Sequence, residues 1–186
     1  MAIKKLWLIF VFAFSVHSFA ANKLNRVYGY FSGSPLPPIM QTGLAYDRLL
    51  DEKWALGLNY NYEGLSFFQY AYWGHGTELI GRFFLWGYGK SWFEKGFIAS
   101  LGTGFNYVYY SFNEEGLGVK NRKSKYQWQF PLTLSASYIY TFDMGLFFEA
   151  GVKAQLTRLQ VPLDDRATRF FINPMPKIYV SLGMAF

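Results

Sequence analysis

The sequence contains no cysteine, little charge and, after its first twenty residues, no long hydrophobic run. Without cysteine there can be no disulfide scaffold, thiol nucleophile or thiolate metal site. Only 16% of the 186 residues are charged and 52% are hydrophobic, which excludes an intrinsically disordered chain. No run of 18 apolar residues follows residue 20, so the rest of the chain holds no helical membrane span. The length is typical of a single domain.

What the sequence has in excess is aromatic side chains. Phe, Tyr and Trp make up 22% of the chain, with 20 Phe, 15 Tyr and 6 Trp, and 18 glycines accompany them. The core of a small water-soluble domain needs far fewer aromatic residues. The composition therefore indicates a fold that places aromatic side chains somewhere other than in a core.

The first twenty residues have the three parts of a secretory signal peptide. Lys4 and Lys5 form a basic start, residues 6–16 are an apolar run, and the run ends before a small-x-small site at Ala20. The apolar run is too short for a membrane anchor, which needs about 20 residues. We predict Sec-type export, cleavage after Ala20 and a mature domain over residues 21–186. The mature net charge of +4 is scattered and gives no reason to expect a nucleic-acid partner.

The rest of the chain alternates between apolar and polar residues with a period of two. From Trp54 to Leu65, for example, Trp, Leu and Tyr side chains fall on one face and Ala, Gly, Asn and Glu on the other. This is the period of a β-strand, because successive side chains point to opposite faces of a sheet. The pattern predicts eight strands, at residues 25–34, 39–50, 54–65, 77–89, 97–112, 127–142, 146–161 and 171–186.

The predicted connections alternate in length. Short turns are expected at residues 51–53, 91–95 and 143–145. The other connections, mostly longer, are expected at residues 35–38, 66–76, 113–126 and 162–170. Short turns at one end and longer loops at the other are typical of outer-membrane barrels.

The two faces of the strands distinguish a membrane barrel from a soluble β-sandwich. In a soluble fold the polar face would be rich in Lys, Glu and Asp, but here it holds mostly Gly, Ala, Ser, Thr, Asn and Gln. Small polar residues suit a narrow lumen, and aromatic residues near strand ends suit the membrane interfaces. The predicted fold class is all-β: an eight-stranded antiparallel transmembrane β-barrel, closed and up-and-down. The soluble β-sandwich is the alternative.

The last strand ends in the aromatic residue Phe186, with four apolar residues on the same face: Ile178, Val180, Leu182 and Met184. This resembles the C-terminal signal of bacterial outer-membrane proteins that the barrel-assembly machinery reads. With the signal peptide and eight strands, the mature chain resembles the small outer-membrane barrels of the OmpA/OmpX type over its full length. The resemblance implies the outer membrane of a Gram-negative bacterium, contact with lipid and lipopolysaccharide, and a monomer. It extends to architecture only, because no subfamily motif is present.

Six charged residues should point into the lumen by alternation: Asp47, Glu63, Glu78, Arg82, Glu149 and Lys153. Side chains just about fill the interior of an eight-stranded barrel, and a buried charge is costly unless it is paired. We predict an internal ion-pair network in which Arg82 and Lys153 meet the carboxylates. Such a network would fix the strand register and fill the lumen; the alternatives are a gated proton or ion path or a narrow channel for small solutes.

Four cations lie close together in the predicted third outer loop: Lys120, Arg122, Lys123 and Lys125. Lys and Arg are the usual partners of phosphate, so these residues are candidates for contact with lipopolysaccharide phosphates. A solvated, charged loop tip is the alternative.

The only histidine of the mature chain is His75, which the pattern places in the second outer loop. It is the one candidate for a catalytic base, acting on Ser66 or Ser111 and oriented by Asp164 or Asp165. The chain lacks the His-x-Ser pair of deacylase barrels and the Asp-Ser pair of palmitoyltransferase barrels. We expect no catalytic site, metal or cofactor, and a structural or recognition role through the outer loops. The alternative is a lipid A acyl hydrolase or acyltransferase that uses His75.

Overall fold

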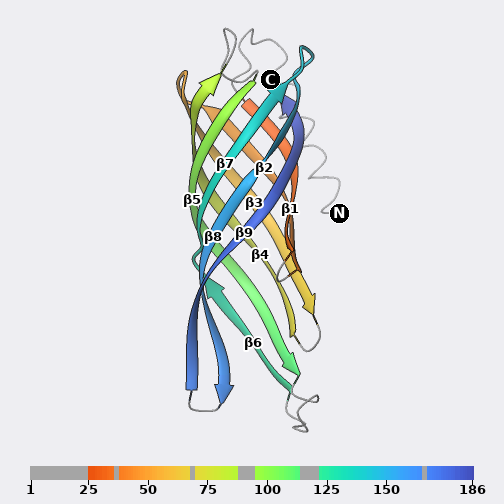
Figure 1. Ribbon diagram of the computed structural model, residues 1–186, viewed down its shortest axis with the longest axis vertical. Coiled ribbons are helices and arrows are strands. Elements are labelled where there is room, and N and C mark those ends of the chain that lie inside the picture. The colour runs from red at the N-terminus through yellow and green to blue at the C-terminus, as the bar shows by residue number, and fades with distance from the viewer. Residues whose placement is uncertain (1–24, 36–37, 68–69, 88–94, 114–121, 165–166) are drawn as a thin grey trace, which may run out of the picture.

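The computed structural model describes residues 25–35, 38–67, 70–87, 95–113, 122–164 and 167–186, which form a closed antiparallel β-barrel (Figure 1). The alternating pattern of the sequence accounts for these strands, since each buries one face and exposes the other. The strands are β1 (Asn25–Pro35), β2 (Pro38–Leu49), β3 (Trp54–Phe67), β4 (Tyr70–Gly87), β5 (Lys95–Asn113), β6 (Arg122–Gln129), β7 (Leu132–Thr141), β8 (Leu146–Asp164) and β9 (Ala167–Ala185).

Neighbours along the chain pair around the barrel, and β1 pairs with β9 to close it. Strands β6 and β7 share one register against β5, with Gln129 opposite Asn106 and Leu132 opposite Thr103. They therefore act as one wall strand with a break at residues 130–131, and the barrel has eight walls. No helix in the described part of the chain is long and apolar enough to cross a membrane.

The barrel has a short-turn end and a hairpin end. At the short-turn end, a carboxylate oxygen of Asp51 accepts hydrogen bonds from the backbone N–H groups of Lys53 and Trp54 at 2.7 and 2.8 Å. The short turn between β7 and β8 uses Gly145 at a φ of 88°, a left-handed conformation that glycine adopts without strain. Figure 1 shows the C-terminus at this same end. The predicted turn over residues 91–95 lies, except for Lys95, outside the described residues.

The prediction of a long second loop over residues 66–76 is wrong. Strand β3 continues to Phe67 and β4 already begins at Tyr70. Strands also extend into the predicted third and fourth loops, because β6 begins at Arg122, β8 ends at Asp164 and β9 begins at Ala167. Long hairpins therefore replace most of the predicted loops.

Toward the hairpin end, the wall opens between β6 and β8. Pairing of β7 with β8 ends at Leu156, and pairing of β9 with β1 ends at Ile178, so the outer part of β8–β9 is a two-stranded ribbon. Pro174 and Pro176 lie just before this ribbon, opposite Leu156 and Ala154, where β9 has no β1 partner and a missing N–H costs no bond to a third strand. Figure 1 shows the β8–β9 ribbon separating from the β5–β6 hairpin.

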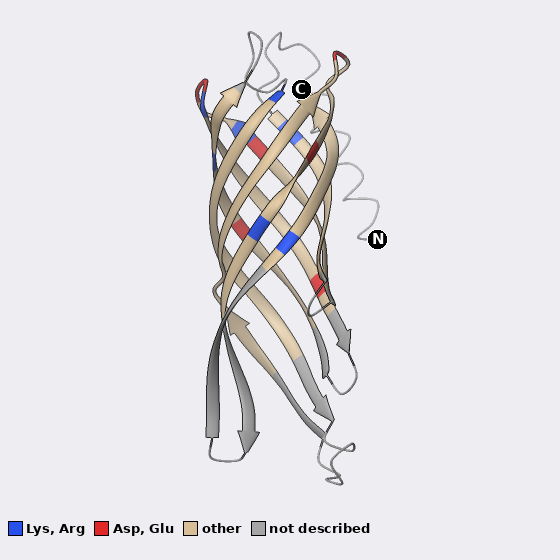
Figure 2. Ribbon diagram, in the orientation of Figure 1, with Lys and Arg blue, Asp and Glu red and all other residues tan. Residues whose placement is uncertain are grey.

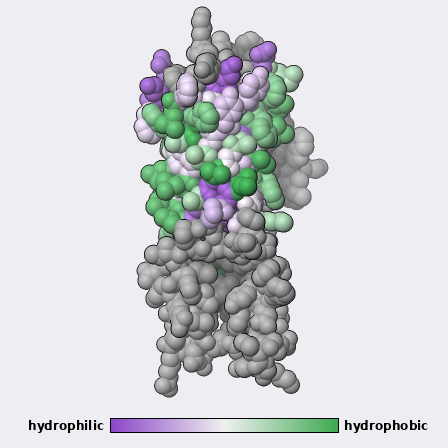
Figure 3. All heavy atoms as spheres, viewed as in Figure 1, coloured by the Kyte–Doolittle hydropathy of each residue, from purple (hydrophilic) through white to green (hydrophobic). Residues whose placement is uncertain are grey.

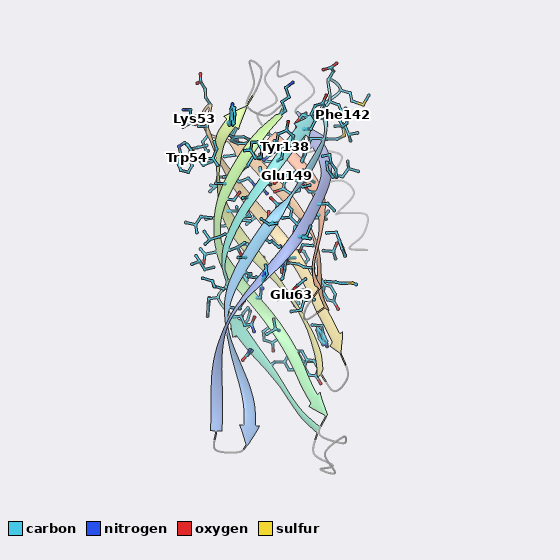
Figure 4. All side chains as sticks on the ribbon, in the orientation of Figure 1. Lys53, Trp54, Glu63, Tyr138, Phe142 and Glu149 are labelled. Carbon is cyan, nitrogen blue, oxygen red and sulfur yellow. The ribbon has the colours of Figure 1, made fainter. Side chains whose placement is uncertain are left out.

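The outer surface of the barrel is apolar and carries aromatic side chains near the short-turn end. Figure 4 shows Trp54, Tyr138 and Phe142 at that end. The outward positions of residues 54–64, 73–83, 97–109, 132–142, 146–156 and 176–184 include no Lys, Arg, Asp or Glu. In Figure 3, hydrophobic side chains cover much of the flanks and hydrophilic ones gather at the short-turn end. The barrel is therefore inverted relative to a soluble protein, with an apolar outside and a charged inside.

Candidate functional site: the charged lumen

Among the described residues, eight charged side chains are buried in the lumen. The structure places all six residues of the predicted network inside the barrel, each at most 9% exposed, together with Arg26 and Lys177. The set has four positive and four negative charges. In Figure 2 the charged segments of the barrel ribbon lie at two heights, and Figure 4 places Glu149 near the short-turn end and Glu63 farther along.

The cluster nearer the short-turn end, here called the arginine cluster, consists of Arg26, Asp47, Arg82 and Glu149. An Nη of Arg26 lies 2.6 Å from Asp47, and Nε of Arg82 lies 3.1 Å from the same carboxylate oxygen. Arg82 also reaches Glu149 at 2.9 Å. One guanidinium therefore bridges two carboxylates from β2 and β8, which are separated in the wall by β1 and β9.

Hydroxyl groups complete the arginine cluster. Ser137 and Tyr179 each donate to the same oxygen of Glu149 at 2.7 Å. The Tyr28 hydroxyl donates to Asp47 at 3.2 Å and accepts a hydrogen bond from Arg82. Since buried charges are stable only when paired and hydrogen-bonded, this arrangement can hold four charges in the lumen.

The second cluster, here called the lysine cluster, consists of Glu63, Glu78, Lys153 and Lys177. Lys177 pairs with Glu63 at 3.1 Å and also donates to the side-chain oxygen of Gln155 at 2.8 Å. Glu78 accepts hydrogen bonds from Thr133 at 2.9 Å and from Gln155 at 3.4 Å. Neutral amide and hydroxyl groups thus make most of the contacts in this cluster.

We expected Lys153 to pair with a carboxylate, but in the structure it does not. It donates to the side-chain oxygen of Gln41, and its Nζ lies 5.1 Å from the centre of the Tyr30 ring. In the described part of the chain it has no carboxylate within 4 Å. Glu63 instead finds its cation in Lys177, which comes from the last strand. The contacts of Lys153 are thus the amide dipole of Gln41 and the face of the Tyr30 ring.

An apolar plug closes the short-turn end of the lumen. Phe84, Ile98, Ile139 and Phe147 point inward from four different strands, and each is at most 1% exposed. They belong to one core cluster, and the guanidinium of Arg26 lies 5.2 Å from the centre of the Phe147 ring. The lumen is therefore packed with hydrocarbon at the short-turn end and with paired charges farther from that end.

Sequence reasoning missed Arg26, Lys177 and the plug. The same alternation would have found the first two, because Arg26 precedes outward-facing Val27 and Lys177 precedes Ile178. The plug had a weaker signal: adjacent phenylalanines at residues 83–84 and 147–148, where one ring must point inward.

His75 lies on the outer wall of β4, not in a loop, and the side chain is exposed. Its ring contacts are with Tyr60 and Tyr107, at 6.2 and 6.4 Å between ring centres. No hydrogen bond from His75 to a hydroxyl or carboxylate is present among the described residues. Ser66 and Ser111 lie on β3 and β5, and Asp164 ends β8; Asp165 falls outside the described residues.

The four candidate cations are only partly described. Arg122, Lys123 and Lys125 lie in β6, paired with β5 at Asn113, Phe112 and Tyr110, while Lys120 lies outside the described residues. The described residues contain no group of three His, Asp or Glu side chains placed to hold a metal ion.

The C-terminal residues form the closing seam. Ile178, Val180, Leu182 and Met184 are exposed on the outer face of β9, and the backbone of Phe186 exchanges two 2.9 Å hydrogen bonds with Asn25. The proposed assembly signal is therefore part of the strand that closes the barrel on β1.

No protein-family model matches this sequence, and no curated protein matches it in sequence. Solved structures do match. The N-terminal β-barrel domain of Pseudomonas aeruginosa OprF is 12% identical, with a TM-score of 0.51 over 88% of this chain and 98% of that one. Neisserial surface protein A is 8% identical, with a TM-score of 0.50 over 87% and 94%. The chain therefore has the fold of the small eight-stranded outer-membrane barrels of the OmpA/OmpX type.

Proposed function

We propose that this protein is a non-enzymatic barrel of a Gram-negative outer membrane, with a filled lumen and a structural or recognition role at its hairpin end. The observation that supports this most is the inverted distribution of charge. The outward positions of the described wall carry no charge except Arg48 and Lys95 near the short-turn end, whereas eight charges are buried inside. An apolar outer surface of this kind is suited to contact with lipid.

The filled lumen is the reason to favour this role over a channel. The plug and the arginine cluster occupy successive levels of the interior, and the side chains of both are buried. In planar bilayers, we expect the purified protein to give no discrete current steps. On gels, the unheated protein should migrate faster than the boiled one. Current steps would favour the channel, and identical migration together with periplasmic fractionation would favour a soluble sandwich.

Orientation can be tested because the chain has no cysteine. We expect Ser124→Cys, on the β5–β6 hairpin, to react with a membrane-impermeable maleimide on intact cells. Asp51→Cys, at the short-turn end, should react only after the outer membrane is opened. The reverse pattern would contradict an outward hairpin end.

Recognition would involve the cations of the β5–β6 hairpin. Replacing Lys120, Arg122, Lys123 and Lys125 by Gln should lower the amount of lipopolysaccharide that co-purifies with the barrel. Lys53→Gln with Lys95→Gln, near the short-turn end, is the control for lost charge. Equal retention by both variants would remove the lipopolysaccharide-phosphate proposal.

The enzymatic alternative has its own test. A mass spectrum of lipid A from cells with the protein, without it, and with His75→Ala should be the same in all three. The lack of a hydrogen-bonded partner for His75 among the described residues supports this expectation. A change in acyl number that disappears with His75→Ala would make the protein a lipid A enzyme.

A further inference from the structure

Six ring-bearing side chains form a continuous block on the outer wall of β4, β5 and β6. The aromatic block consists of Trp73, His75, Tyr107, Tyr109, Tyr126 and Trp128. The strand register aligns it in two rows of three: Trp73 opposite Tyr109 and then Tyr126, and His75 opposite Tyr107 and then Trp128.

Ring contacts connect the whole block. Tyr107 stacks on Tyr126 at 5.4 Å with an interplanar angle of 12°, and lies 4.8 Å from Trp128. Tyr109 lies 4.8 Å from Tyr126 and 5.2 Å from Trp73. His75 joins through Tyr107 at 6.4 Å. Mutual packing of this kind fixes the rings relative to one another, so the block is a preformed surface.

The block holds most of the rings of its two rows. Both rows continue through β3, β2 and β1 to β9. There the row of Trp73 carries no further ring, and the row of His75 carries two, Tyr62 and Phe31. A girdle that only anchors a barrel in lipid would have no reason to gather most of its rings on one side.

The block also has a definite depth. Phe97 belongs to the aromatic residues at the short-turn end of β5, and Tyr107 lies ten residues farther along the same strand. At about 3.4 Å per residue and a tilt of about 40°, the two rings are about 26 Å apart along the membrane normal. This is close to the height of the apolar band of such barrels, so the block faces the headgroups of the outer leaflet.

We propose that the aromatic block binds the saccharide headgroup of an outer-leaflet glycolipid. None of its six positions carries Lys, Arg, Asp or Glu, so it does not match a phosphate. It combines ring faces with three tyrosine hydroxyls, two indole N–H groups and an imidazole. The C–H groups of a sugar ring suit the negative faces of aromatic rings, and sugar hydroxyls suit the polar tips.

Acyl chains and a second copy fit the block less well. The mostly aliphatic wall of β9, β1 and β2 already suits acyl chains, which offer no partner to a tyrosine hydroxyl or an indole N–H. A second copy would have to cover those polar tips with its own groups. The inference depends on the proposed membrane location, but it concerns a surface separate from the cations of the β5–β6 hairpin.

Native mass spectrometry of the barrel from lipid nanodiscs tests the proposal. The nanodiscs contain phosphatidylcholine with a small, equal fraction of digalactosyldiacylglycerol or phosphatidylglycerol. The first probe adds sugar without phosphate, and the second adds charge without the sugar ring. We expect the barrel to retain the galactolipid about threefold more than phosphatidylcholine. Tyr107→Leu with Trp128→Leu should abolish this preference.

The matched control is Phe97→Leu with Trp86→Leu, which removes two rings from the short-turn end. Gel mobility of the unheated protein monitors folding, and the single variant Trp128→Leu replaces the double one if the latter does not fold. Retention lost in the block variant alone supports the proposal. Three other results would overturn it. The first is equal retention of galactolipid and phosphatidylcholine, and the second is a preference for phosphatidylglycerol that only the hairpin cation variant removes. The third is a dimer mass that the block variant abolishes. A silent bilayer with no galactolipid preference would reject this inference and leave the proposed function standing.

Discussion

The arginine and lysine clusters carry the same charges but are built differently. In the arginine cluster, two guanidiniums and two carboxylates touch directly, with all three ion pairs at or below 3.1 Å. In the lysine cluster, the one ion pair among the described residues joins Lys177 to Glu63, and the other cation, Lys153, contacts an amide. Buried charge is thus stabilised mainly by direct ion pairs in the arginine cluster and mainly by neutral polar groups in the lysine cluster.

The difference follows from the chemistry of the two cations. A guanidinium offers five donors in a rigid plane, so Arg82 can contact Asp47 and Glu149 together. An ammonium is a compact point charge without a rigid fork, and both lysines of the cluster contact neutral amide groups, Lys153 at Gln41 and Lys177 at Gln155. Buried polar atoms without a hydrogen-bond partner among the described residues lie around both clusters. Around the lysine cluster they are Tyr30 Oη, Gln41 Nε2, Asn59 Oδ1, Asn106 Oδ1 and both side-chain polar atoms of Asn61, and around the arginine cluster they include Glu149 Oε2, Ser100 Oγ and Ser181 Oγ. Each such atom costs about 1–3 kcal/mol.

Removing the centre of the arginine cluster should have the largest effect. Arg82→Ala would leave Asp47 and Glu149 buried with one arginine between them. We expect the free energy of unfolding to fall by about 3–5 kcal/mol, since a broken buried ion pair leaves an uncompensated charge. The measurement is the denaturant midpoint of the barrel in detergent, with gel mobility as a second readout.

Arg82→Lys is the control, because it keeps the charge but not the fork. It should recover only part of the loss, since one ammonium cannot satisfy both carboxylates in the same way. Full recovery would show that charge balance alone matters and that the geometry of the arginine cluster does not.

Both clusters could be partly predicted from the sequence, because strand alternation is a strict rule. A period of two assigns a face to every residue once one residue is assigned, and all six predicted charges lie inside. Which carboxylate each cation contacts could not be predicted. Which strands face each other across a lumen depends on barrel tilt and stagger, which the period does not contain.

The prediction of the loop boundaries was wrong for a different physical reason. Gly74 and Gly76 flank His75 and look like turn residues, so the pattern predicts a loop there. In the structure they are strand residues that point inward. A Cβ on Gly76 would collide with the side-chain oxygen of Asn106, and one on Gly74 with the side chain of Val108. Glycine is needed here for a close approach inside a narrow barrel, which local sequence does not distinguish from a turn.

Removing a ring of the apolar plug, which lies between the arginine cluster and the short-turn end, should have the second-largest effect on stability. Phe147→Ala removes a fully buried ring that packs edge-on against Tyr28 at 5.6 Å and faces Arg26. We expect a loss of about 3 kcal/mol, from lost burial and the cavity that remains. Because the ring also closes the short-turn end, the variant is the best candidate for a small bilayer conductance.

Phe148→Ala is the matched control, because the neighbouring ring points outward. It should cost less stability and leave the bilayer silent. Equal effects of the two variants would contradict the assignment of an internal plug.

Breaking the single ion pair of the lysine cluster should have a smaller effect than Arg82→Ala. Lys177→Met leaves Glu63 with its contact to Asn106 at 3.4 Å but without this cation. We expect a loss of about 1–3 kcal/mol in the same unfolding measurement, because neutral amides nearby solvate the carboxylate in part. A loss as large as that of Arg82→Ala would show that the two clusters are equally tight. Adding Glu63→Gln to the variant should restore part of the stability.

Lys153→Met should change stability least. Lysine and methionine have similar lengths, and methionine would keep the contact with the Tyr30 ring, where sulfur packs well. The side-chain oxygen of Gln41 would keep a donor, since Ser32 Oγ donates to it at 3.2 Å. The variant loses one positive charge near Glu78 but also removes the cost of burying an ammonium, so we expect a change within about 1 kcal/mol in either direction. A loss above about 3 kcal/mol would mean that Glu78 depends on Lys153 through space, and that the lysine cluster is held by its charges as firmly as the arginine cluster is.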